Sequence, residues 1–317
     1  MPEHKRTHLI QTIDCTPPFD FALSTYILAD GDPQIAKYDG TVYRQVLRVG
    51  GKLLLATVAS VGTIDFPQLR ATFTSDRPLT DHDASAAHAV ISSVFNAHLD
   101  VKPFYHGIQN DPVMAELSGK LRGLKNPATP TVFQALFDSI IEQQIALNVA
   151  HVLQRRVIKA FGDVLVVDGN TYYAFPTSER MALASVDSLR RCGLSRRKAE
   201  YITGIATRIA AHAVDLEGFR RYGETQMILD NLCSLRGVGV WTAEFTALRG
   251  LNRLDVFPAD DLGLRRLVGH YYCSERTITS AQARGIAEQW GKWKGLAGYY
   301  LVVAGLLKIV TKAPNAT

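Results

Sequence analysis

The chain has 317 residues, of which 47% are hydrophobic and 21% charged, so wholesale disorder is excluded and about two domains are expected. It contains no run of about 18 apolar residues and no apolar signal core near Met1, which predicts a soluble, intracellular protein. The net charge of +5 is uneven: residues 1–105 hold 9 basic and 11 acidic residues, so the remainder carries +7. This basic C-terminal part hints at a polyanionic partner.

The first hundred residues have the pattern of β-structure. Residues 38–49 and 52–61 are rich in β-branched and aromatic side chains, and Gly50-Gly51 between them is a hairpin signal. Asp39-Gly40 is a second turn signal. Apolar residues at helical spacing over 84–95 predict a helix, with Asp81 or Asp83 as its cap. We therefore expect an antiparallel β-rich lobe with a helix over residues 1–105.

Helical periodicity dominates after residue 105. The expected helices cover 131–160 with a break near Gln143-Gln144, then 185–192, a helix capped by Ser195 that runs to about 213, and then 226–234, 241–250, 262–272, 280–290 and 296–311. The fold class is thus α+β, with an all-α domain over 106–317. We expect this domain to form two packed helical subdomains with a cleft between them.

The four cysteines give no metal or disulfide pattern. Cys15, Cys192, Cys233 and Cys273 never pair at CxxC spacing, which argues against a zinc knuckle, an iron–sulfur cluster and a disulfide framework. No acidic cluster accompanies the nine scattered histidines. The sequence therefore predicts no catalytic metal and no cofactor.

The most informative segment is LCSLRGVGVWTAEFTALRG at 232–250. Gly237 and Gly239 permit a tight turn between two helices, and the N–H groups of Gly239, Val240 and Trp241 then open the second helix. A helix N-terminus binds phosphate without sequence preference. A plain helix–helix turn is the alternative, but the flanking residues match the helix-hairpin-helix pattern L-x-G-[VI]-G-x-x-T-A.

A pair of acids follows the hairpin in DVFPADDLGLRR at 255–266. Pro258 blocks helix continuation, so Asp260 or Asp261 opens the next helix. Such an acid can be a simple N-cap. A carboxylate at the mouth of a cleft beside the hairpin can also stabilise an oxocarbenium-like sugar while a glycosidic bond breaks.

With these motifs, the chain resembles the helix-hairpin-helix DNA glycosylases, and most of all the alkylation-repair branch of 3-methyladenine DNA glycosylase II. FQALFDSIIEQQIAL (133–147), FPTSERMALASVDSLRRCGLSRRKAEYI (175–202) and AEQWGKWKGLAGYYL (287–301) are similar to further family segments, and PPFDF (17–21) to the family's N-terminal lobe. The resemblance spans nearly the whole chain and is specific at 235–266.

The resemblance implies roles for several residues. Asp261 matches the family's catalytic aspartate, with Asp260 as the fallback. Trp241 stands where the branch that also cleaves the DNA backbone has a lysine, so no amine is available there for a Schiff base. Glu142 replaces the glycine that usually precedes the Gln-Gln pair, and Gln144 is the candidate wedge. Carbonyls of Leu235 to Val238 are candidates to hold a structural monovalent cation.

An enzyme that acts on a base in duplex DNA needs phosphate anchors, a wedge, a stacking pocket and a catalyst. We expect the anchors to be Arg236, Gly237, Gly239, Val240 and Thr242. Trp241 and Phe245 share a helix face at i and i+4 and could stack a flipped base. Phe19, Phe21 and Tyr300 are further pocket candidates, although all five aromatic side chains could instead belong to the core.

The resulting hypothesis is a monofunctional base excision repair glycosylase. It would flip out N3- or N7-methylated purines and hydrolyse the N-glycosidic bond to leave an abasic site. The alternatives are a glycosylase for oxidised or deaminated purines, and an inactive helix-hairpin-helix DNA-binding protein. The expected partner is damaged double-stranded DNA, bound by a monomer. The expected location is the cytoplasm with its nucleoid in a prokaryote, or the nucleus in a eukaryote.

Overall fold

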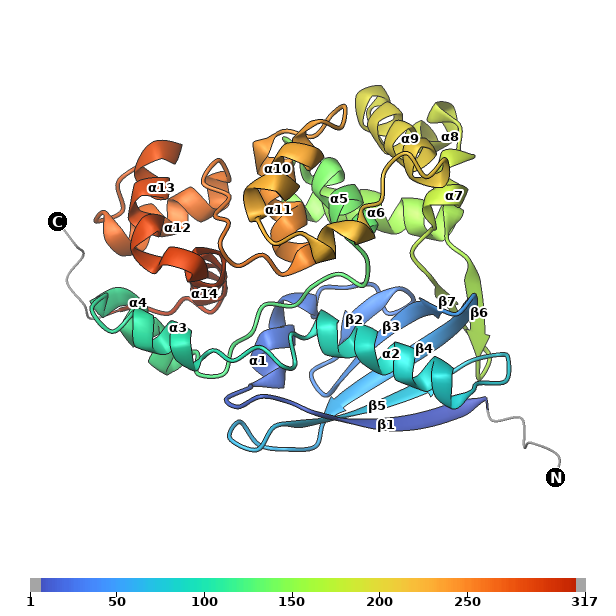
Figure 1. Cartoon of the computed structure of the whole chain (residues 1–317), viewed down its shortest axis with the longest axis horizontal. Helices are drawn as coiled ribbons and strands as arrows, with labels where there is room; N and C mark the ends of the chain where they lie inside the picture. The colour runs from blue at the N-terminus through green and yellow to red at the C-terminus, as the bar shows by residue number, and fades with distance from the viewer. Residues whose placement is uncertain (1–6, 312–317) are drawn as a thin grey trace.

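The structure is a computed structural model and describes residues 7–311. Its N-terminal lobe is a five-stranded antiparallel sheet in the order β1-β5-β4-β3-β2 (Figure 1). The strands are β1 (His8–Asp14), β2 (Ala36–Tyr38), β3 (Val42–Val49), β4 (Lys52–Ser60) and β5 (Gln68–Thr74). The short helices α1 (Phe21–Thr25) and η1 (Tyr26–Leu28) follow β1, and α2 (Asp81–Val94) packs on the sheet. The β-rich lobe is therefore confirmed.

Local sequence signals explain the turns of this lobe. Gly50 and Gly51 both have positive φ, and Val49 pairs with Lys52, as the hairpin prediction requires. The expected strand over 38–49 is divided by the Asp39-Gly40 turn. The cap of α2 is Thr80, so the expectation of Asp81 or Asp83 is wrong. Asp83 is instead the third helical residue, and its carboxylate completes a capping box with Thr80.

The hairpin-bearing helical part has its own core, built from residues 132–256. It contains α5 (Val132–Glu142), α6 (Leu147–Phe161), α7 (Ser178–Ala182), α8 (Val186–Arg191), α9 (Arg196–Ala210), η2 (Glu217–Arg221), α10 (Thr225–Cys233) and α11 (Val240–Leu251). The predicted break at Gln143-Gln144 is confirmed, because Gln144 has φ +55° between α5 and α6. Ser195 caps α9 as predicted.

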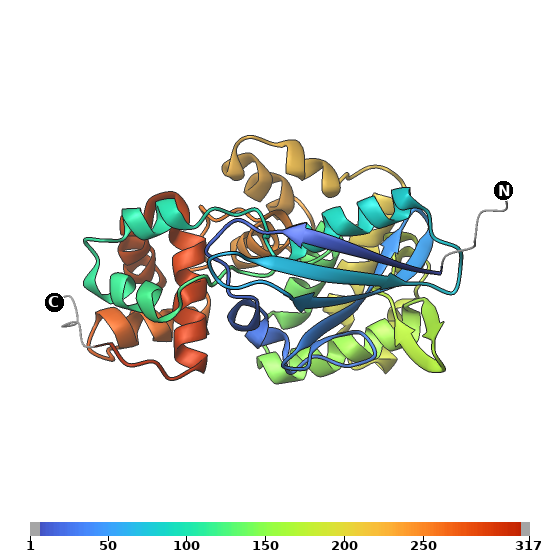
Figure 2. The same ribbon diagram turned by 90° about the horizontal axis from the view of Figure 1, so that it is seen from below.

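A second helical core joins two distant segments of the chain. Its C-terminal members are α12 (Leu262–Tyr272), α13 (Ser280–Ala287), η3 (Glu288–Trp293) and α14 (Lys294–Leu306). Against them pack α3 (Lys102–Gly107) and α4 (Pro112–Lys120), which the sequence analysis did not predict. Figures 1 and 2 show this body at the opposite end of the molecule from the N-terminus. The core of the sheet lobe ends at Ala97, and Val101 already belongs to this second helical core.

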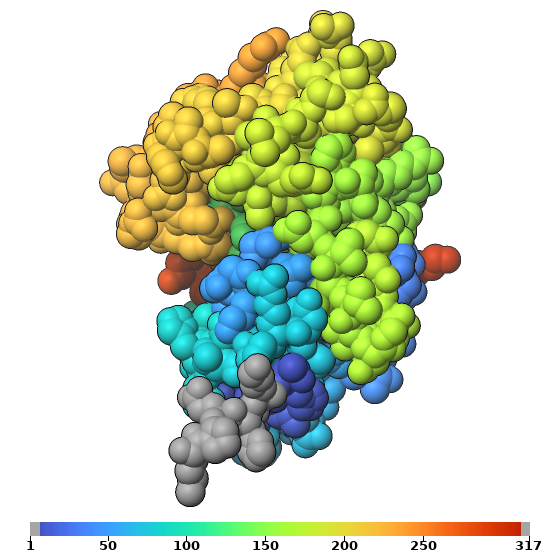
Figure 3. All heavy atoms as spheres, turned by 90° about the vertical axis from the view of Figure 1, so that its right-hand side faces the viewer, coloured from blue at the N-terminus to red at the C-terminus, as the bar shows by residue number. Residues whose placement is uncertain are grey.

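The expectation of an all-α C-terminal domain is wrong at one place. Strands β6 (Val164–Val167) and β7 (Asn170–Tyr173) form an antiparallel hairpin. Leu165 and Val167 pack with Val46 and Leu55 of the N-terminal sheet. In Figure 3 the yellow-green part of the chain accordingly lies against the blue lobe. Among residues 7–311, no helix combines the length and apolar character that a membrane crossing requires.

Candidate active site and nucleic-acid interface

The turn between α10 and α11 contains two glycines that differ in backbone conformation and in the space around them. Gly237 has φ +92°, and a Cβ at this position would lie 2.2 Å from the ring of Tyr201, so only glycine fits. Gly239 has φ −96° and open space around its missing Cβ. It is the N-cap of α11, and no side chain caps the helix. The first N–H groups of α11 therefore open toward a surface that another molecule can approach closely.

The end of α5 fixes this hairpin in place. Gln143 Nε2 donates 2.9 Å hydrogen bonds to the Gly237 carbonyl and to Thr242 Oγ1. The Thr242 side chain is only 2% exposed, so the expectation that it contacts DNA does not fit, and it serves the hairpin from inside. Lys198 Nζ donates to the carbonyls of Ile141 and Gln143 at 2.7 Å. Gln144, which follows Gln143 in the chain, is exposed beside the hairpin.

Arg236 carries a positive charge at the tip of the turn. Its side chain is 81% exposed, and its nearest acidic partner is Glu200 at 3.5 Å. The guanidinium carbon lies 5.8 Å from the centre of the Tyr201 ring. Such an exposed cation beside free helix N–H groups suits a phosphate.

Two of the carbonyls named for a monovalent cation already accept hydrogen bonds. Those of Leu235 and Gly237 accept from the Val238 N–H and from Gln143, respectively. Each carbonyl oxygen retains a second lone pair, and a monovalent cation at this turn stays a prediction. Within residues 7–311, no group of three or more histidine, cysteine, aspartate and glutamate side chains could hold a metal ion.

Asp261 lies next to the aromatic face of α11. It is the N-cap of α12, and its Oδ1 accepts a 2.7 Å hydrogen bond from the Leu264 N–H. Its Oδ2 accepts from the Trp241 indole Nε1 at 3.3 Å. The carboxylate is half-buried and held in orientation by these two donors, whereas Asp260 is exposed. The N-cap prediction is confirmed for Asp261, and the role of a cleft carboxylate stays a prediction.

From the contact with Asp261, a row of three side chains runs along α11. Trp241, Phe245 and Arg249 stand four residues apart and share one face of the helix. The Trp241 and Phe245 rings meet edge to face with centroids 4.9 Å apart. The Arg249 guanidinium lies 4.3 Å from the Phe245 ring centre. All three are half-buried, so they form a partly accessible row that begins at Asp261.

The other three aromatic candidates are core residues, and the expectation that they line a base pocket is wrong. Phe19 and Phe21 are buried in the sheet lobe, where Phe21 packs edge to face with Tyr38 and Phe95. Tyr300 is fully buried, and its hydroxyl donates to the Leu124 carbonyl. Each instead ties its lobe together.

Two exposed side chains near Phe21 were missed. Tyr26 and Ile27 of η1 are 44% and 36% exposed. The half-buried Tyr299 of α14 donates from its hydroxyl to the Ser24 carbonyl at 3.4 Å, which joins this turn to the C-terminal helices. Because η1 has only three residues, no periodic spacing indicates which of its side chains are exposed, so the sequence held no signal for this pair.

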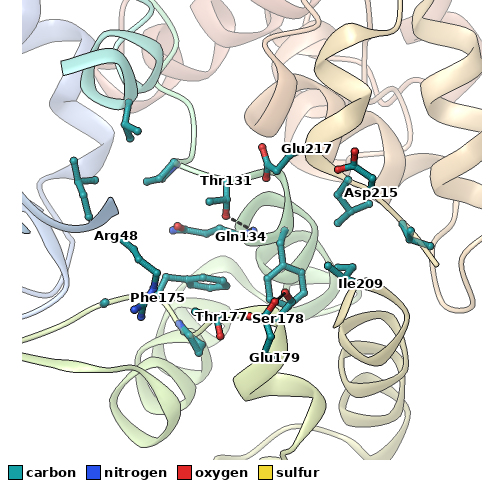
Figure 4. A pocket seen from close by; sticks show the side chains of 18 of the residues that line it. Arg48, Thr131, Gln134, Phe175, Thr177, Ser178, Glu179, Ile209, Asp215 and Glu217 are labelled. Carbon is teal, nitrogen blue, oxygen red and sulfur yellow. Dashed lines mark hydrogen bonds between the residues drawn. The ribbon is translucent and has the colours of Figure 1, made fainter. Parts of the chain in front are cut away.

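A cavity of about 610 Å³ lies elsewhere, between the sheet lobe and the hairpin-bearing helices (Figure 4). Phe133 and Phe175 contribute apolar surface, and Glu179, Asp215 and Glu217 contribute carboxylates. Thr131 at its wall is occupied as the cap of α5, where its Oγ1 accepts from the Gln134 N–H. The lining does not include Asp261, Trp241 or Phe245. The cavity is thus separate from the row on α11.

Fold and site together define a helix-hairpin-helix protein with a carboxylate beside a half-buried pair of aromatic rings. A model of the HhH-GPD superfamily of base excision DNA repair proteins matches residues 137–292, which include the hairpin and Asp261. The matched part of the chain, residues 137–292, belongs to this superfamily.

Individual relatives are more specific. The chain is 27% identical over 277 residues to a DNA-3-methyladenine glycosylase of Bacillus subtilis, covering 87% of this chain and 90% of that protein. It is 30% identical over 188 residues to DNA-3-methyladenine glycosylase 2 of Escherichia coli, covering 58% and 61%. The structure of a 3-methyladenine DNA-glycosylase from Archaeoglobus fulgidus matches with a TM-score of 0.82 at 25% identity, covering 95% of this chain and all of that one.

The same fold serves other members. An 8-oxoguanine glycosylase/lyase from Clostridium acetobutylicum, bound to double-stranded DNA, matches with a TM-score of 0.74 at 17% identity, covering 95% of this chain and 99% of that one. This likeness shows a shared fold alone.

Proposed function

We propose that the chain is a monofunctional DNA glycosylase that excises N3- and N7-methylated purines from double-stranded DNA and leaves an abasic site. The observation that carries this proposal is the contact between the Asp261 carboxylate and Trp241, directly below the hairpin. The similarity to relatives named 3-methyladenine glycosylases supports the substrate class.

The hairpin would hold the DNA backbone. The N–H groups at the start of α11 and the exposed Arg236 offer donors and positive charge to phosphate, with no contact that reads sequence. Gln144, exposed at the turn after α5, is the candidate to fill the gap that a flipped base leaves. The hydrogen bond from Gln143 to the Gly237 carbonyl would hold Gln144 at a fixed position relative to the phosphate-binding hairpin.

The row on α11 would receive the base. Purines methylated at N3 or N7 are cationic, and the faces of Trp241 and Phe245 attract a cation more than a neutral ring. The weakened C1′–N bond breaks and its electron pair leaves with the base, which departs neutral. Asp261, held by Trp241 and the Leu264 N–H, stabilises the positive charge that develops on the sugar. Water then adds at C1′, and its proton passes to solvent.

Strand cleavage is not expected. The indole of Trp241 carries no amine that could form a Schiff base with the sugar. Lys198, the lysine that reaches the end of α5, is occupied by two backbone carbonyls and half-buried.

Base release from methylated duplex DNA tests the proposal. Wild type and Asp261→Asn are compared with and without hot alkali, and Asp260→Asn serves as the matched control. We expect wild type and the control to release methylated bases, strand breaks to need alkali, and Asp261→Asn to be slower by about 100-fold or more. Breaks without alkali would reveal a lyase. Binding without release of methylated bases would contradict the proposed substrate class, and oxidised bases such as 8-oxoguanine, the base named for a structural neighbour, and deaminated bases would be tested next.

A further inference from the structure

The row on α11 does not end with the two aromatic rings. Its third member, Arg249, is 31% exposed and lies over Phe245, whose ring also meets Trp241. These contacts run without a gap from Asp261 to Arg249. A guanidinium thus lies at the end of the half-buried row on which the proposed function places the flipped base.

The position of Arg249 is fixed from α5, which packs beside α11 (Figure 1). Arg249 Nη1 donates a 2.6 Å hydrogen bond to Glu142 Oε2, and the Glu142 side chain is 9% exposed. Glu142 Oε1 accepts a further hydrogen bond from Gln154 Nε2 at 3.3 Å. Glu142 is the residue that departs from the glycine usual in the resembled family, so this ion pair distinguishes the present chain.

The charges of the group are balanced. Asp138 lies one turn before Glu142 on α5, and burial, reinforced by the charge of Glu142, raises the pKa of Asp138 well above its usual range. The ion pair with Glu142 offsets the charge of Arg249. Their neutral pair does not repel a cationic base as a lone guanidinium would.

The guanidinium keeps hydrogen-bonding capacity for a ligand. It has five N–H donors, and over residues 7–311 the structure gives it one hydrogen bond, to Glu142. A second ion pair on α11 provides a contrast. Arg284 meets the buried Glu244 at 2.8 Å, away from the aromatic rings. Arg249 alone of these two arginines stacks on a ring of the row.

We propose that Arg249, positioned by Glu142, is a specificity-determining residue that donates to a carbonyl oxygen on the edge of the flipped base. This inference rests on the proposed function. Guanine-derived bases carry the acceptor O6, whereas adenine-derived bases carry an amino group at the same place. Arg249 therefore favours N7-methylguanine over N3-methyladenine.

The test uses one DNA that carries both lesions. DNA treated with dimethyl sulfate contains N7-methylguanine and N3-methyladenine, and the released bases are separated by chromatography. The double variant E142Q/R249M removes both charges and leaves no buried charge unpaired. We expect its rate ratio of N7-methylguanine to N3-methyladenine release to fall about tenfold or more, the effect of one hydrogen bond to a charged donor. R249K keeps both charges but loses the planar fork, and should give an intermediate ratio.

The control is E244Q/R284M, which removes the other ion pair of α11 and should leave the ratio unchanged. The ratio responds to base recognition and is insensitive to the amount of folded protein, so a purely structural role of Arg249 would not move it. An unchanged ratio in both E142Q/R249M and R249K overturns the inference. Failure of wild type to release either base would instead overturn the proposed function.

Discussion

The two glycines of the hairpin make opposite predictions for the same substitution. Gly237 has φ +92° with the Tyr201 ring 2.2 Å from the place of a Cβ, whereas Gly239 has φ −96° and nothing within 4 Å of that place. Alanine at Gly237 should therefore impair folding. Alanine at Gly239 should leave folding nearly unchanged and obstruct the approach of a phosphate.

The magnitudes follow from these geometries. A left-handed conformation costs an alanine about 1–2 kcal/mol, and displacement of a packed ring costs about 1–3 kcal/mol. Gly237→Ala should then lose about 3 kcal/mol. With an unfolding entropy of about 2.1 cal/mol/K per residue over 317 residues, the midpoint Tm falls by about 4–5 °C. Gly239→Ala exchanges one N-cap for a poorer one, at less than about 1 kcal/mol.

Thermal unfolding and DNA binding are measured on both variants at one fixed salt concentration. Gly239→Ala should bind duplex DNA about tenfold more weakly, the loss of one hydrogen bond to a charged phosphate, with a Tm close to wild type. Gly237→Ala should show the lower Tm. A Gly239→Ala variant that binds DNA like wild type would refute the assignment of the start of α11 as a phosphate site.

Three further predictions concern other contacts. Trp241→Phe removes the donor to Asp261 and should slow base release about tenfold, while DNA affinity, measured by fluorescence anisotropy, stays unchanged. Gln143→Ala removes two hydrogen bonds from the hairpin and should lower both Tm and DNA affinity; a loss of neither would contradict its tethering role. Burial lowers the pKa of Lys125 from 10.5 to about 8, so between these pH values the unfolded chain binds a proton that the folded chain lacks. The free energy of unfolding should gain about 3 kcal/mol from this group as pH rises through that interval. Urea titrations at both pH values give the free energy of unfolding of wild type and of Lys125→Met. The change in this free energy between the two pH values should be larger in wild type, and the difference measures the gain.

The parts of the site that depend on turns and helix caps could be predicted from the sequence. The hairpin residues depend on turns and caps, whose rules operate over a few neighbouring residues. The same rules left Asp260 and Asp261 as alternatives for the next cap, and the family resemblance favoured Asp261. The Gly50-Gly51 turn and the Ser195 cap follow the same logic. For the same reason the β6–β7 hairpin could have been found, since Asp168-Gly169 is a strong turn signal and both residues have positive φ.

Burial of individual aromatic residues could not be predicted. Phe21 is buried by Tyr38 and Phe95, which are far from it in the sequence. The short helices α3 and α4 lack a long apolar period, and their packing partners are the helices after residue 257. Nor did any spacing rule indicate that Arg249 would meet Glu142, because that pair exists only where α5 and α11 pack together.

The discontinuous second core has a consequence for synthesis on the ribosome. The core of the hairpin-bearing helices is complete once residue 256 has emerged, but α3 and α4 wait for α12 to α14 before their apolar faces are covered. Asp261 stands at the entry to that last segment, as the cap of α12. Because domains fold as they emerge, a nascent chain should acquire the hairpin before the carboxylate is in place, and base excision should begin only when the final helix has closed the second core.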